Sequence, residues 1–247
     1  MRIAIAGGSG LLGSHVTRVA RERGHEPVVL SRRTGVDLVS GAGLAERLRG
    51  ARAVIDVSNI QTGRPELSVS FFAGATANLL RQGRIAGVEH HIALTIVGME
   101  AAPDGYYAGK LAQERSVSAG AVPWSILRAT QFHEFPAMYY HRSAPVHSAA
   151  SGRLQPVAAR EVAERLVGLA ESAPVGRAPD LAGPQEESLA AMIRAYAHAI
   201  GRSAPVPIVH VPGAYGRALR SGALLPGAGA DRGVQTYAEW LDDLPDA

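Results

Sequence analysis

Residues 2–13 read Arg-Ile-Ala-Ile-Ala-Gly-Gly-Ser-Gly-Leu-Leu-Gly, a short apolar run that leads into a glycine-rich turn. The run at 3–6 predicts a buried parallel strand, and the pattern at 11–20 predicts a helix that begins directly after the glycines. A glycine pattern alone is also compatible with a flexible turn. The strand before it and the amphipathic helix after it favour a phosphate-binding turn of the kind that holds a dinucleotide.

Each glycine of this turn has its own expected purpose. Gly7 permits the sharp change from strand to helix, Gly10 lets a phosphate approach the backbone because it has no Cβ, and Gly13 lets the helix pack closely on the sheet. The helix N-terminus adds unpaired N–H groups and the positive end of a dipole, which favour an anion. The expected dinucleotide contacts here are Gly7, Ser9, Gly10, Leu11, Leu12 and Gly13.

Length and composition limit the classes of protein to which this chain can belong. The 247 residues are enough to bury the core of one large α/β domain, so a single domain spanning 1–247 is expected. The 25 basic and 22 acidic residues are interleaved without a basic run, which does not indicate a nucleic-acid partner. The sequence contains no cysteine, which excludes disulfides, thiol catalysis and thiolate metal sites. No apolar run approaches the length of a signal-peptide core or a membrane span, so we expect a cytoplasmic protein without a membrane partner.

Strand and helix patterns alternate along the first half of the chain. Apolar strand patterns lie at 27–31, 54–57, 92–97 and 125–127. Helical patterns lie between them at 44–48, 66–85 and 106–119. This order predicts an α/β fold, with a doubly wound parallel sheet that is covered by helices on both faces. Ligands of such folds bind beyond the carboxyl ends of the strands.

The second half of the chain follows a looser order. Helical patterns at 160–171 and 187–200 and a strand pattern at 206–211 are separated by segments rich in proline and glycine. We expect this half to complete the edge of the sheet and to form a small, mobile C-terminal substrate lobe. The lobe is expected to come mainly from 133–157 and 183–233.

Two arginines follow the second expected strand, in the sequence Ser31-Arg32-Arg33. A site specific for NAD normally places an acid here to hold the ribose 2′-hydroxyl, whereas a guanidinium fork suits a 2′-phosphate. We therefore expect NADP(H) to be preferred over NAD(H), with Ser31, Arg32 and Arg33 in contact with it. Two alternatives stay open: the arginines are only solvated, or Asp37 reaches the adenine or ribose and weakens the case against NAD.

Residues 95–132 carry a resemblance to a known family. Four segments are similar to the atypical short-chain dehydrogenases/reductases of the NmrA-like NAD(P)-binding group: Thr95-Ile-Val-Gly98, Tyr106-Tyr-Ala-Gly-Lys110, Glu114 and Trp124-Ser-Ile-Leu-Arg-Ala-Thr-Gln-Phe132. Together with the glycine turn, the resemblance covers roughly residues 1–165. It implies a Rossmann-like fold and an NADP(H) cofactor. The functions it implies range from reductases, quinone reductases included, to redox-sensing regulators without turnover.

Tyr106 and Lys110 are four residues apart and therefore share one face of a helix. A nearby ammonium favours the phenolate, so the spacing predicts that Lys110 lowers the tyrosine pKa and that Tyr106 acts as the catalytic acid. The resemblance implies in addition that Lys110 binds the nicotinamide ribose. Tyr107 is the rival proton donor, because it lies on nearly the same face. Either tyrosine is also compatible with simple packing at a helix start.

Thr95 lies at the end of its strand, where reductases of the family carry a serine, so the resemblance implies that its hydroxyl orients a substrate oxygen. A β-branched residue also suits the strand itself, which leaves a structural Thr95 as the alternative. Gly105 and Gly109 flank the tyrosines, and glycine inside a helix costs on the order of 1 kcal/mol. We expect the first turn of this helix to be mobile, or to tighten only with cofactor bound.

Further cofactor contacts are expected after two other strands. The first group is Val57, Ser58 and Asn59, for which an ordinary turn is the alternative. The second group is Thr130, Gln131 and Phe132, in which Gln131 would bind the carboxamide or a substrate and Phe132 would wall the pocket. His133, beside Glu134, is a candidate for proton transfer, although a loop histidine is more often only exposed.

Other chemistries lack support in the sequence. The adjacent His90 and His91 would point to opposite faces of a strand, and no histidine pair has the spacing of a zinc motif, so no metal is expected. No Gly-x-Ser-x-Gly elbow follows a strand. Two functions remain: an NADPH-dependent reductase of a small carbonyl or quinone, and a non-catalytic NADP(H) sensor that acts through a protein partner. Because sensing needs no proton donor, the pair Tyr106 and Lys110 favours the enzyme.

Overall fold

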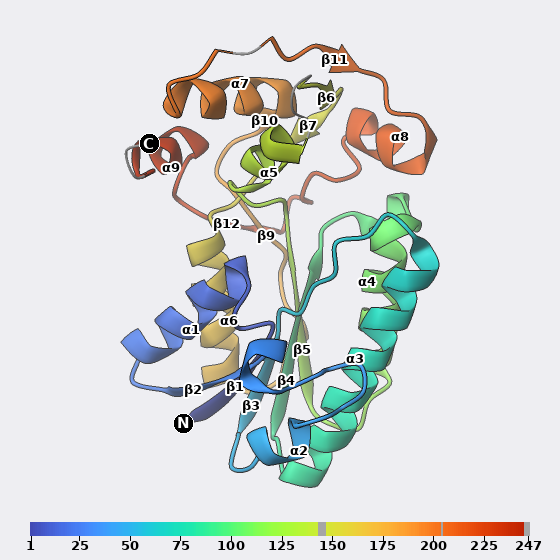
Figure 1. Cartoon of the computed structure of the whole chain (residues 1–247), viewed down its shortest axis with the longest axis vertical. Coiled ribbons are helices and arrows are strands. Elements are labelled where there is room, and N and C mark those ends of the chain that lie inside the picture. The colour runs from blue at the N-terminus through green and yellow to red at the C-terminus, as the bar shows by residue number, and fades with distance from the viewer. Residues whose placement is uncertain (143–146, 204, 245–247) are drawn as a thin grey trace. The chain divides into compact units, whose positions relative to one another are not determined.

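The computed structural model of the chain describes residues 1–142, 147–203 and 205–244, which form two compact units (Figure 1). Unit 1 comprises Met1–Thr95, Pro103–Arg128 and Arg160–Ala178. Unit 2 comprises Ile96–Ala102, Ala129–Ala159 and Pro179–Ala247. Each unit is therefore assembled from segments that are distant in sequence.

Unit 1 is built on a parallel sheet with the strand order β2-β1-β3-β4-β5-β8. The strands are β1 (Arg2–Ala6), β2 (Glu26–Leu30), β3 (Ala53–Asp56), β4 (His90–Ile96), β5 (Trp124–Ala129) and β8 (Gly176–Arg177). Residues 3–6 of β1 are fully buried, which explains why this strand is a continuous apolar run instead of an alternating pattern. In the register of the sheet, Ala6 lies opposite both Leu30 and Asp56, so β1, β2 and β3 end at the same level.

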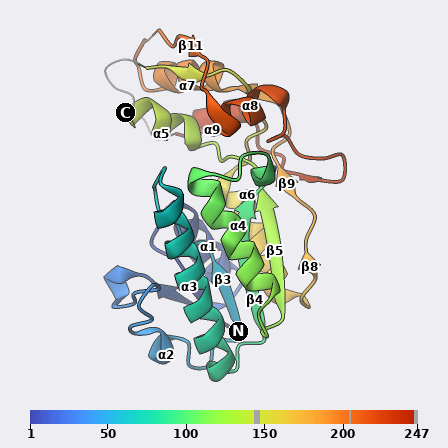
Figure 2. The same cartoon turned by 90° about the vertical axis from the view of Figure 1, so that its right-hand side faces the viewer.

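Helices cover both faces of this sheet. They are α1 (Leu11–Glu22), α2 (Leu44–Arg47), α3 (Pro65–Ala86), α4 (Gly105–Ser118) and α6 (Ala159–Glu171), with the short 3-10 helix η1 (Arg32–Thr34) after β2. Helices α3 and α4 lie on one face, and α1 and α6 lie on the other (Figure 2). Pro65 begins α3, where its missing N–H costs nothing. On the α3 face, Leu30, Leu44, Val54 and Leu79 are fully buried together.

The α/β alternation expected for the first half of the chain is confirmed. The strands and helices of unit 1 that the sequence predicts begin and end within two residues of the expected boundaries, whereas the short strand β8 and the 3-10 helix η1 were not predicted. This agreement follows from the strength of the local signals, because buried apolar runs alternate with helical patterns along this half of the chain. No helix among the described residues is both long and apolar enough to cross a membrane.

Unit 2 combines helices with two-residue strands. The helices are α5 (Phe135–Arg142), α7 (Leu189–Ala199), α8 (Gly213–Ser221) and α9 (Tyr237–Asp242), with the 3-10 helix η2 (Met99–Ala101). The strands form three pairs in the described residues: β6 (Ala149–Ala150) with β11 (Ile208–Val209), β7 (Arg153–Leu154) with β10 (Glu187–Ser188), and β9 (Leu181–Ala182) with β12 (Asp231–Arg232).

Two boundaries predicted for the second half need correction. The strand expected at 206–211 is only Ile208–Val209. The helix expected from residue 187 begins at Leu189, because Glu187–Ser188 pairs as an antiparallel strand with Arg153–Leu154. The glycine- and proline-rich tail also contains the helix Gly213–Ser221, which ends at Gly222 in the left-handed conformation, with φ of 76°.

Candidate nucleotide-binding site

The glycine turn after β1 is packed tightly on one side and open at Gly10. Gly7 has φ of +79°, and a Cβ there would lie 2.8 Å from both the Cα of Ser58 and the carbonyl oxygen of Val57. A Cβ on Gly13 would overlap the carbonyl oxygen of Gly7. At Gly10 a Cβ would meet only that same oxygen, at 3.3 Å, and Gly10 is exposed. The turn therefore needs glycine for packing at two positions and leaves room for a ligand at the third.

The N-terminus of α1 is available to an anion. Gly10 is its N-cap, no side chain in the described chain caps the helix, and its first turn holds no acid. Ser9 and Leu11 are exposed, whereas Leu12 is 6% exposed and packs in the core. The first N–H groups of a helix have no partner within it, so these residues can offer backbone donors to a phosphate.

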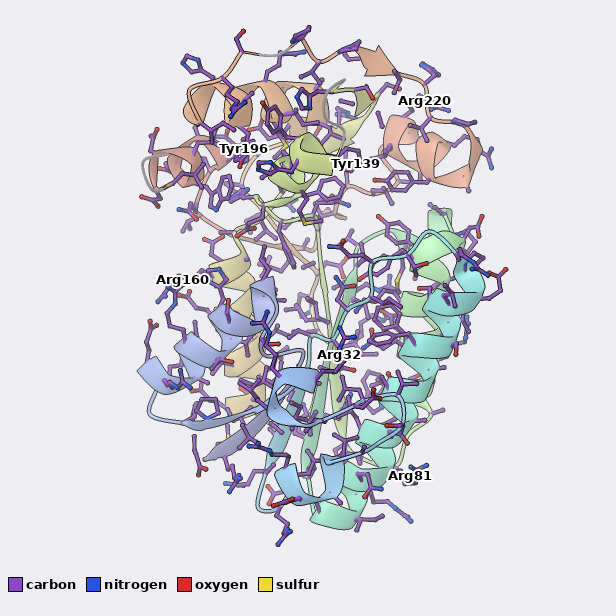
Figure 3. The ribbon with its side chains drawn as sticks, viewed as in Figure 1. Arg32, Arg81, Tyr139, Arg160, Tyr196 and Arg220 are labelled. Atoms are coloured by element: carbon purple, nitrogen blue, oxygen red, sulfur yellow. The ribbon has the colours of Figure 1, made fainter. Side chains whose placement is uncertain are left out.

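The turn after β2 presents its two arginines to solvent. Ser31 and Thr34 form a capping box around η1, in which Thr34 Oγ1 accepts from the Ser31 N–H at 3.1 Å. Arg32 and Arg33 are both exposed, and Arg32 extends from this turn in Figure 3. The Asp37 carboxylate accepts the N–H groups of Ser40 and Val39, and these bonds hold the pKa of Asp37 below its usual range. Asp37 is thus engaged within its own loop.

The end of β3 lies against the glycine turn. Val57 donates its N–H to the carbonyl of Ala6 at 3.0 Å, and Ser58 donates its N–H to Asp56 Oδ1 at 3.0 Å. Ser58 Oγ is buried without a hydrogen-bond partner among the described residues, whereas Asn59 is exposed. The structure therefore brings Val57 and Ser58 to the turn, where the backbone of Gly7 packs against both.

Lys110 is held inside unit 1 by an arrangement that includes two residues the sequence did not single out. Its Nζ donates to the Leu94 carbonyl at 3.0 Å and to Gln113 Oε1 at 2.9 Å. Gln113 Nε2 donates in turn to Asp56 Oδ2 at 2.9 Å. Burial lowers the pKa of Lys110 to about 8, and the charges of Asp56 and Glu114 oppose that decrease. Lys110 is connected in this way to the residue that also binds Ser58.

The position of Tyr106 corrects one expectation. Tyr106 is half-buried beside the ring of Phe72, with 5.6 Å between the ring centroids. Burial raises the pKa of Tyr106, and the nearby Tyr107 and Asp56 raise it further. The expected lowering by Lys110 is wrong, because the ammonium turns toward β4 and Gln113, and the phenol stays protonated at neutral pH.

Gly109 has a packing role that the sequence did not indicate. A Cβ at this position would overlap Ser68 Oγ on α3 and would lie 2.6 Å from the Phe72 ring. Ser68 Oγ also donates to the carbonyl of Tyr106 at 2.9 Å. The glycine thus permits a close crossing of α3 and α4, and the Ser68 hydrogen bond joins the first turn of α4 to α3.

Thr95 is committed to a buried ionic cluster. It is 2% exposed, and its hydroxyl donates to Glu114 Oε1 at 2.6 Å. Arg128 binds both oxygens of Glu114 at 2.8 Å, and Arg177 binds Oε2 at 2.9 Å. Burial alone would raise the pKa of Glu114, but these hydrogen bonds outweigh it and lower the pKa to about 2. The hydrogen that was expected to orient a substrate oxygen is given to Glu114.

The third expected group belongs to unit 2. Thr130 is buried and donates its hydroxyl to the carbonyl of Gln155 at 2.6 Å, and Phe132 forms a parallel bridge with Val157. Both polar side-chain atoms of Gln131 are buried without a hydrogen-bond partner in the described part of the chain. The amide of Gln131 therefore has hydrogen-bonding capacity that the described residues do not satisfy.

His133 lies in the interior of unit 2, where its side chain has no exposed surface. It is fully buried, with its Nε2 3.1 Å from the carbonyl of Gln235. Its ring lies 5.7 Å from the ring of Tyr237 and 6.1 Å from that of Trp240, measured between centroids. The packing assigns His133 to the core of unit 2, which corrects its expected exposure. Burial raises the pKa of its neighbour Glu134.

The residues of unit 1 fit a dinucleotide. The glycine turn is a cradle that a Cβ would fill, the N-terminus of α1 is uncapped, and Ser58 Oγ is orphaned beside the turn. Gly7 donates its N–H to the carbonyl of Leu30 at 3.0 Å, which joins the turn to the β2 end that leads into Ser31. Across the residues that the structure describes, no group of three or more histidines or acids could hold a metal ion.

Comparison with known proteins supports the fold. No family model matches the chain, and no curated protein sequence matches it. Several solved structures match the chain in fold. A UDP-glucose 4-epimerase of Thermus thermophilus in complex with NAD is 18% identical, with 98% of each chain covered and a TM-score of 0.69. A nucleoside-diphosphate-sugar epimerase of Staphylococcus aureus is 16% identical, with 98% of this chain and 100% of that chain covered and a TM-score of 0.70.

A third similar structure is a short-chain dehydrogenase/reductase superfamily protein of Agrobacterium tumefaciens with bound NAD. It is 16% identical, the match covers 98% of this chain and 95% of that chain, and the TM-score is 0.67. At such identities the similarity establishes the architecture alone. The Rossmann-like doubly wound α/β fold that the glycine turn and the strand order predict is thereby confirmed.

Proposed function

We propose that this protein is an NAD(P)H-dependent oxidoreductase of the short-chain dehydrogenase/reductase type that reduces a small carbonyl or quinone. The observation that carries the proposal is that Lys110, four residues after Tyr106, is linked through Gln113 to Asp56 beside the glycine turn. The NAD-bound structures of the same fold support a nicotinamide dinucleotide as the cofactor class. The segments at 95–132 favour the NmrA-like group within this type.

Three parts of unit 1 would hold the cofactor. The N–H groups at the start of α1 would bind the pyrophosphate, and Lys110 would bind the nicotinamide ribose. Arg32 and Arg33 would bind a 2′-phosphate, which supports a preference for NADP(H), because Asp37 is engaged in its own loop. When bound, the reduced cofactor supplies a hydride to the substrate.

Tyr106 would give the proton that accompanies hydride transfer. Because its pKa is raised, the phenol keeps its proton at neutral pH, and a carbonyl oxygen needs a proton donor in the reductive direction. Tyr106 is half-buried, whereas Tyr107 is only 9% exposed, which favours Tyr106 as the donor. Thr95 would hold α4 through Glu114 and would not polarise the substrate.

Turnover tests this proposal directly. A panel of aldehydes, ketones and quinones should contain at least one compound that drives NADPH oxidation above background. With a carbonyl substrate, Tyr106→Phe should lower kcat by about 10² to 10⁴-fold with cofactor affinity almost unchanged, whereas Tyr107→Phe serves as the matched control. A smaller loss with a quinone is expected, since hydride transfer to a quinone depends less on a proton donor. Turnover that is indifferent to both substitutions would overturn the tyrosine mechanism.

The same assay distinguishes the second function. A protein that binds NADPH tightly and turns over no compound of the panel would be a non-catalytic sensor of NADP(H) that acts through a protein partner. Capture of a partner with and without NADPH would then be the next measurement. Failure to bind either nucleotide would overturn both functions.

A further inference from the structure

Lys110 is the only lysine in the sequence, and the other 24 of the 25 basic residues are arginines. The lone lysine is also one of the buried charged residues, with 4% of its surface exposed. An arginine is larger and always charged, whereas lysine carries a compact ammonium whose pKa responds to its surroundings. The one lysine side chain of a chain that uses arginine elsewhere thus lies inside unit 1.

Among the described residues, the hydrogen bonds of the ammonium lead to a carboxylate through an amide. Gln113 accepts from Lys110 Nζ at 2.9 Å and donates to Asp56 Oδ2 at 2.9 Å. Gln113 and Asp56 are both fully buried. An ammonium can only donate and a carboxylate can only accept, so the amide has one possible orientation. Asp56 is fixed in turn by the N–H of Ser58 beside the glycine turn.

We propose that Gln113 is a positioning residue for Lys110, that Asp56 sets the direction of its amide, and that the amide oxygen fixes the ammonium for cofactor binding. The inference rests on the proposed function in one respect only, the assignment of Lys110 to the cofactor. It adds Gln113 and Asp56 to the site, and neither of them needs to touch the cofactor or the substrate.

The groups around Lys110 explain why an amide suits this place. The carbonyl of Leu94 faces it from β4, the Phe72 ring lies 4.3 Å from Nζ on the α3 side, and Glu114 acts on it from α4. A carboxylate in direct contact would form an ion pair with the ammonium and hold it in place of a ligand. The amide of Gln113 joins the ammonium to Asp56 by two hydrogen bonds and places no charge in direct contact with the ammonium.

The electrostatics around Asp56 agree with this arrangement. His91 on β4 faces Asp56, and burial lowers the pKa of that histidine although Asp56 opposes the change. A neutral His91 leaves the negative charge of Asp56 to act on Lys110. Of the three N–H groups of the ammonium, two have acceptors among the described residues, so the third remains for a ribose hydroxyl.

The single lysine makes the test unambiguous. Protein grown with lysine labelled with carbon-13 at Cε gives one lysine signal, whose chemical shift reports protonation from pH 6 to 11. The wild-type midpoint is expected near 8. Gln113→Met, which keeps the volume but removes the acceptor, should lower the midpoint by about one pH unit or more. Gln113→Glu places a carboxyl group beside both the ammonium and Asp56, so the two acids share one proton, and the negative charge that they keep next to the ammonium should hold the midpoint at or above the wild-type value.

A control and a second readout separate positioning from a loss of packing. Gln82→Met on α3 makes the same substitution outside this network and should leave the midpoint unchanged. A fall of the midpoint in Gln113→Met without a fall in Gln113→Glu supports the proposal. An unchanged midpoint in Gln113→Met, or a fall in Gln113→Glu, overturns it, and each variant decides alone if the other does not fold.

Cofactor binding then connects the network to the site. The dissociation constant for NADPH, measured by calorimetry across the same pH range, should rise as Lys110 loses its proton. The pH midpoint of this rise should move with the midpoint of the lysine signal in each variant. Binding whose pH profile ignores the Gln113 substitutions overturns the positioning role. If NADPH does not bind at all, the proposed function fails, while the lysine titration still decides whether Gln113 and Asp56 control the ammonium.

Discussion

Glu114→Gln should destabilise unit 1 in a way that depends on pH. Glu114 is 7% exposed and accepts hydrogen bonds from Arg128, Arg177 and Thr95. Glutamine has the same shape but no charge, so both guanidinium groups lose their counter-ion. Arg128 is 13% exposed and cannot recover full hydration, which makes the loss costly.

The magnitude follows from the pKa of Glu114. Its decrease from 4.5 to about 2 corresponds to about 3 kcal/mol of folding free energy at neutral pH, at about 1.4 kcal/mol for each pH unit. Arg177 is 49% exposed, and solvent screens its share of the interaction. We therefore expect Glu114→Gln to lower the free energy of unfolding by about 2 to 3 kcal/mol at pH 7.

The sign of the pH dependence is fixed by the direction of the pKa change. Because the folded pKa lies below the unfolded value, the stabilisation is complete above pH 4.5 and is lost as the pH falls toward 2. The difference in stability between wild type and Glu114→Gln should stay constant from pH 7 to 5 and decrease by roughly half by pH 3. The difference should vanish only below pH 2, where Glu114 is protonated in the folded protein and is nearly equivalent to a glutamine.

Urea unfolding followed by tryptophan fluorescence measures this difference. Trp124 packs at the start of β5 in unit 1, and a Trp240→Phe background removes the signal from unit 2. Glu89→Gln is the matched control, since Glu89 pairs with Arg52 at 2.7 Å but both side chains are more than 60% exposed. The control should show little change. A loss below about 0.5 kcal/mol, or one equal at pH 7 and pH 3, would refute the reasoning.

Three further predictions follow from single positions. Gly10→Val should abolish binding of NADPH and NADH in calorimetry, because a side chain at this position keeps the pyrophosphate from the backbone. Thermal unfolding should change little, because a Cβ there meets only one backbone oxygen, at 3.3 Å; unchanged nucleotide binding would refute the proposed site. Arg32→Ala should weaken NADPH by about 1 to 3 kcal/mol and spare NADH, and equal affinities of the wild type for both nucleotides would contradict the NADP(H) preference. Gly109→Ala should lower stability by about 1 to 3 kcal/mol, because its Cβ overlaps Ser68 Oγ, and an unchanged unfolding midpoint would show that α3 and α4 can separate at no cost.

Much of unit 1 could be predicted because its signals are local. The apolar run before Gly7 is buried on both faces of the sheet, so its sequence alone identifies a parallel strand. Gly7 is required by the positive φ of the turn, and Gly13 is required by packing on the carbonyl oxygen of Gly7, six residues earlier. In unit 2, strands of two residues are too short to leave a periodic pattern, which is why the expected strand at 206–211 is shorter in the structure.

The chemical state of the candidate site could not be predicted in the same way. A spacing of four residues places Tyr106 and Lys110 on one face of a helix, but it says nothing about where a flexible side chain finds its acceptors. The ammonium turns to Leu94 and Gln113, and the phenol is buried beside Phe72, so the pKa of Tyr106 rises where the spacing alone predicted a decrease.

The sequence by itself determined the succession of strands and helices along unit 1, the phosphate turn and the helix that carries Tyr106 and Lys110, because each depends on neighbours close in the chain. Only the tertiary structure decided that Asp56 would meet Gln113, 57 residues away, and that Glu114 would be shared by Thr95, Arg128 and Arg177. Those contacts decide charge and pKa, since electrostatic interactions depend on distance in space and on burial, and neither is written in the local sequence pattern.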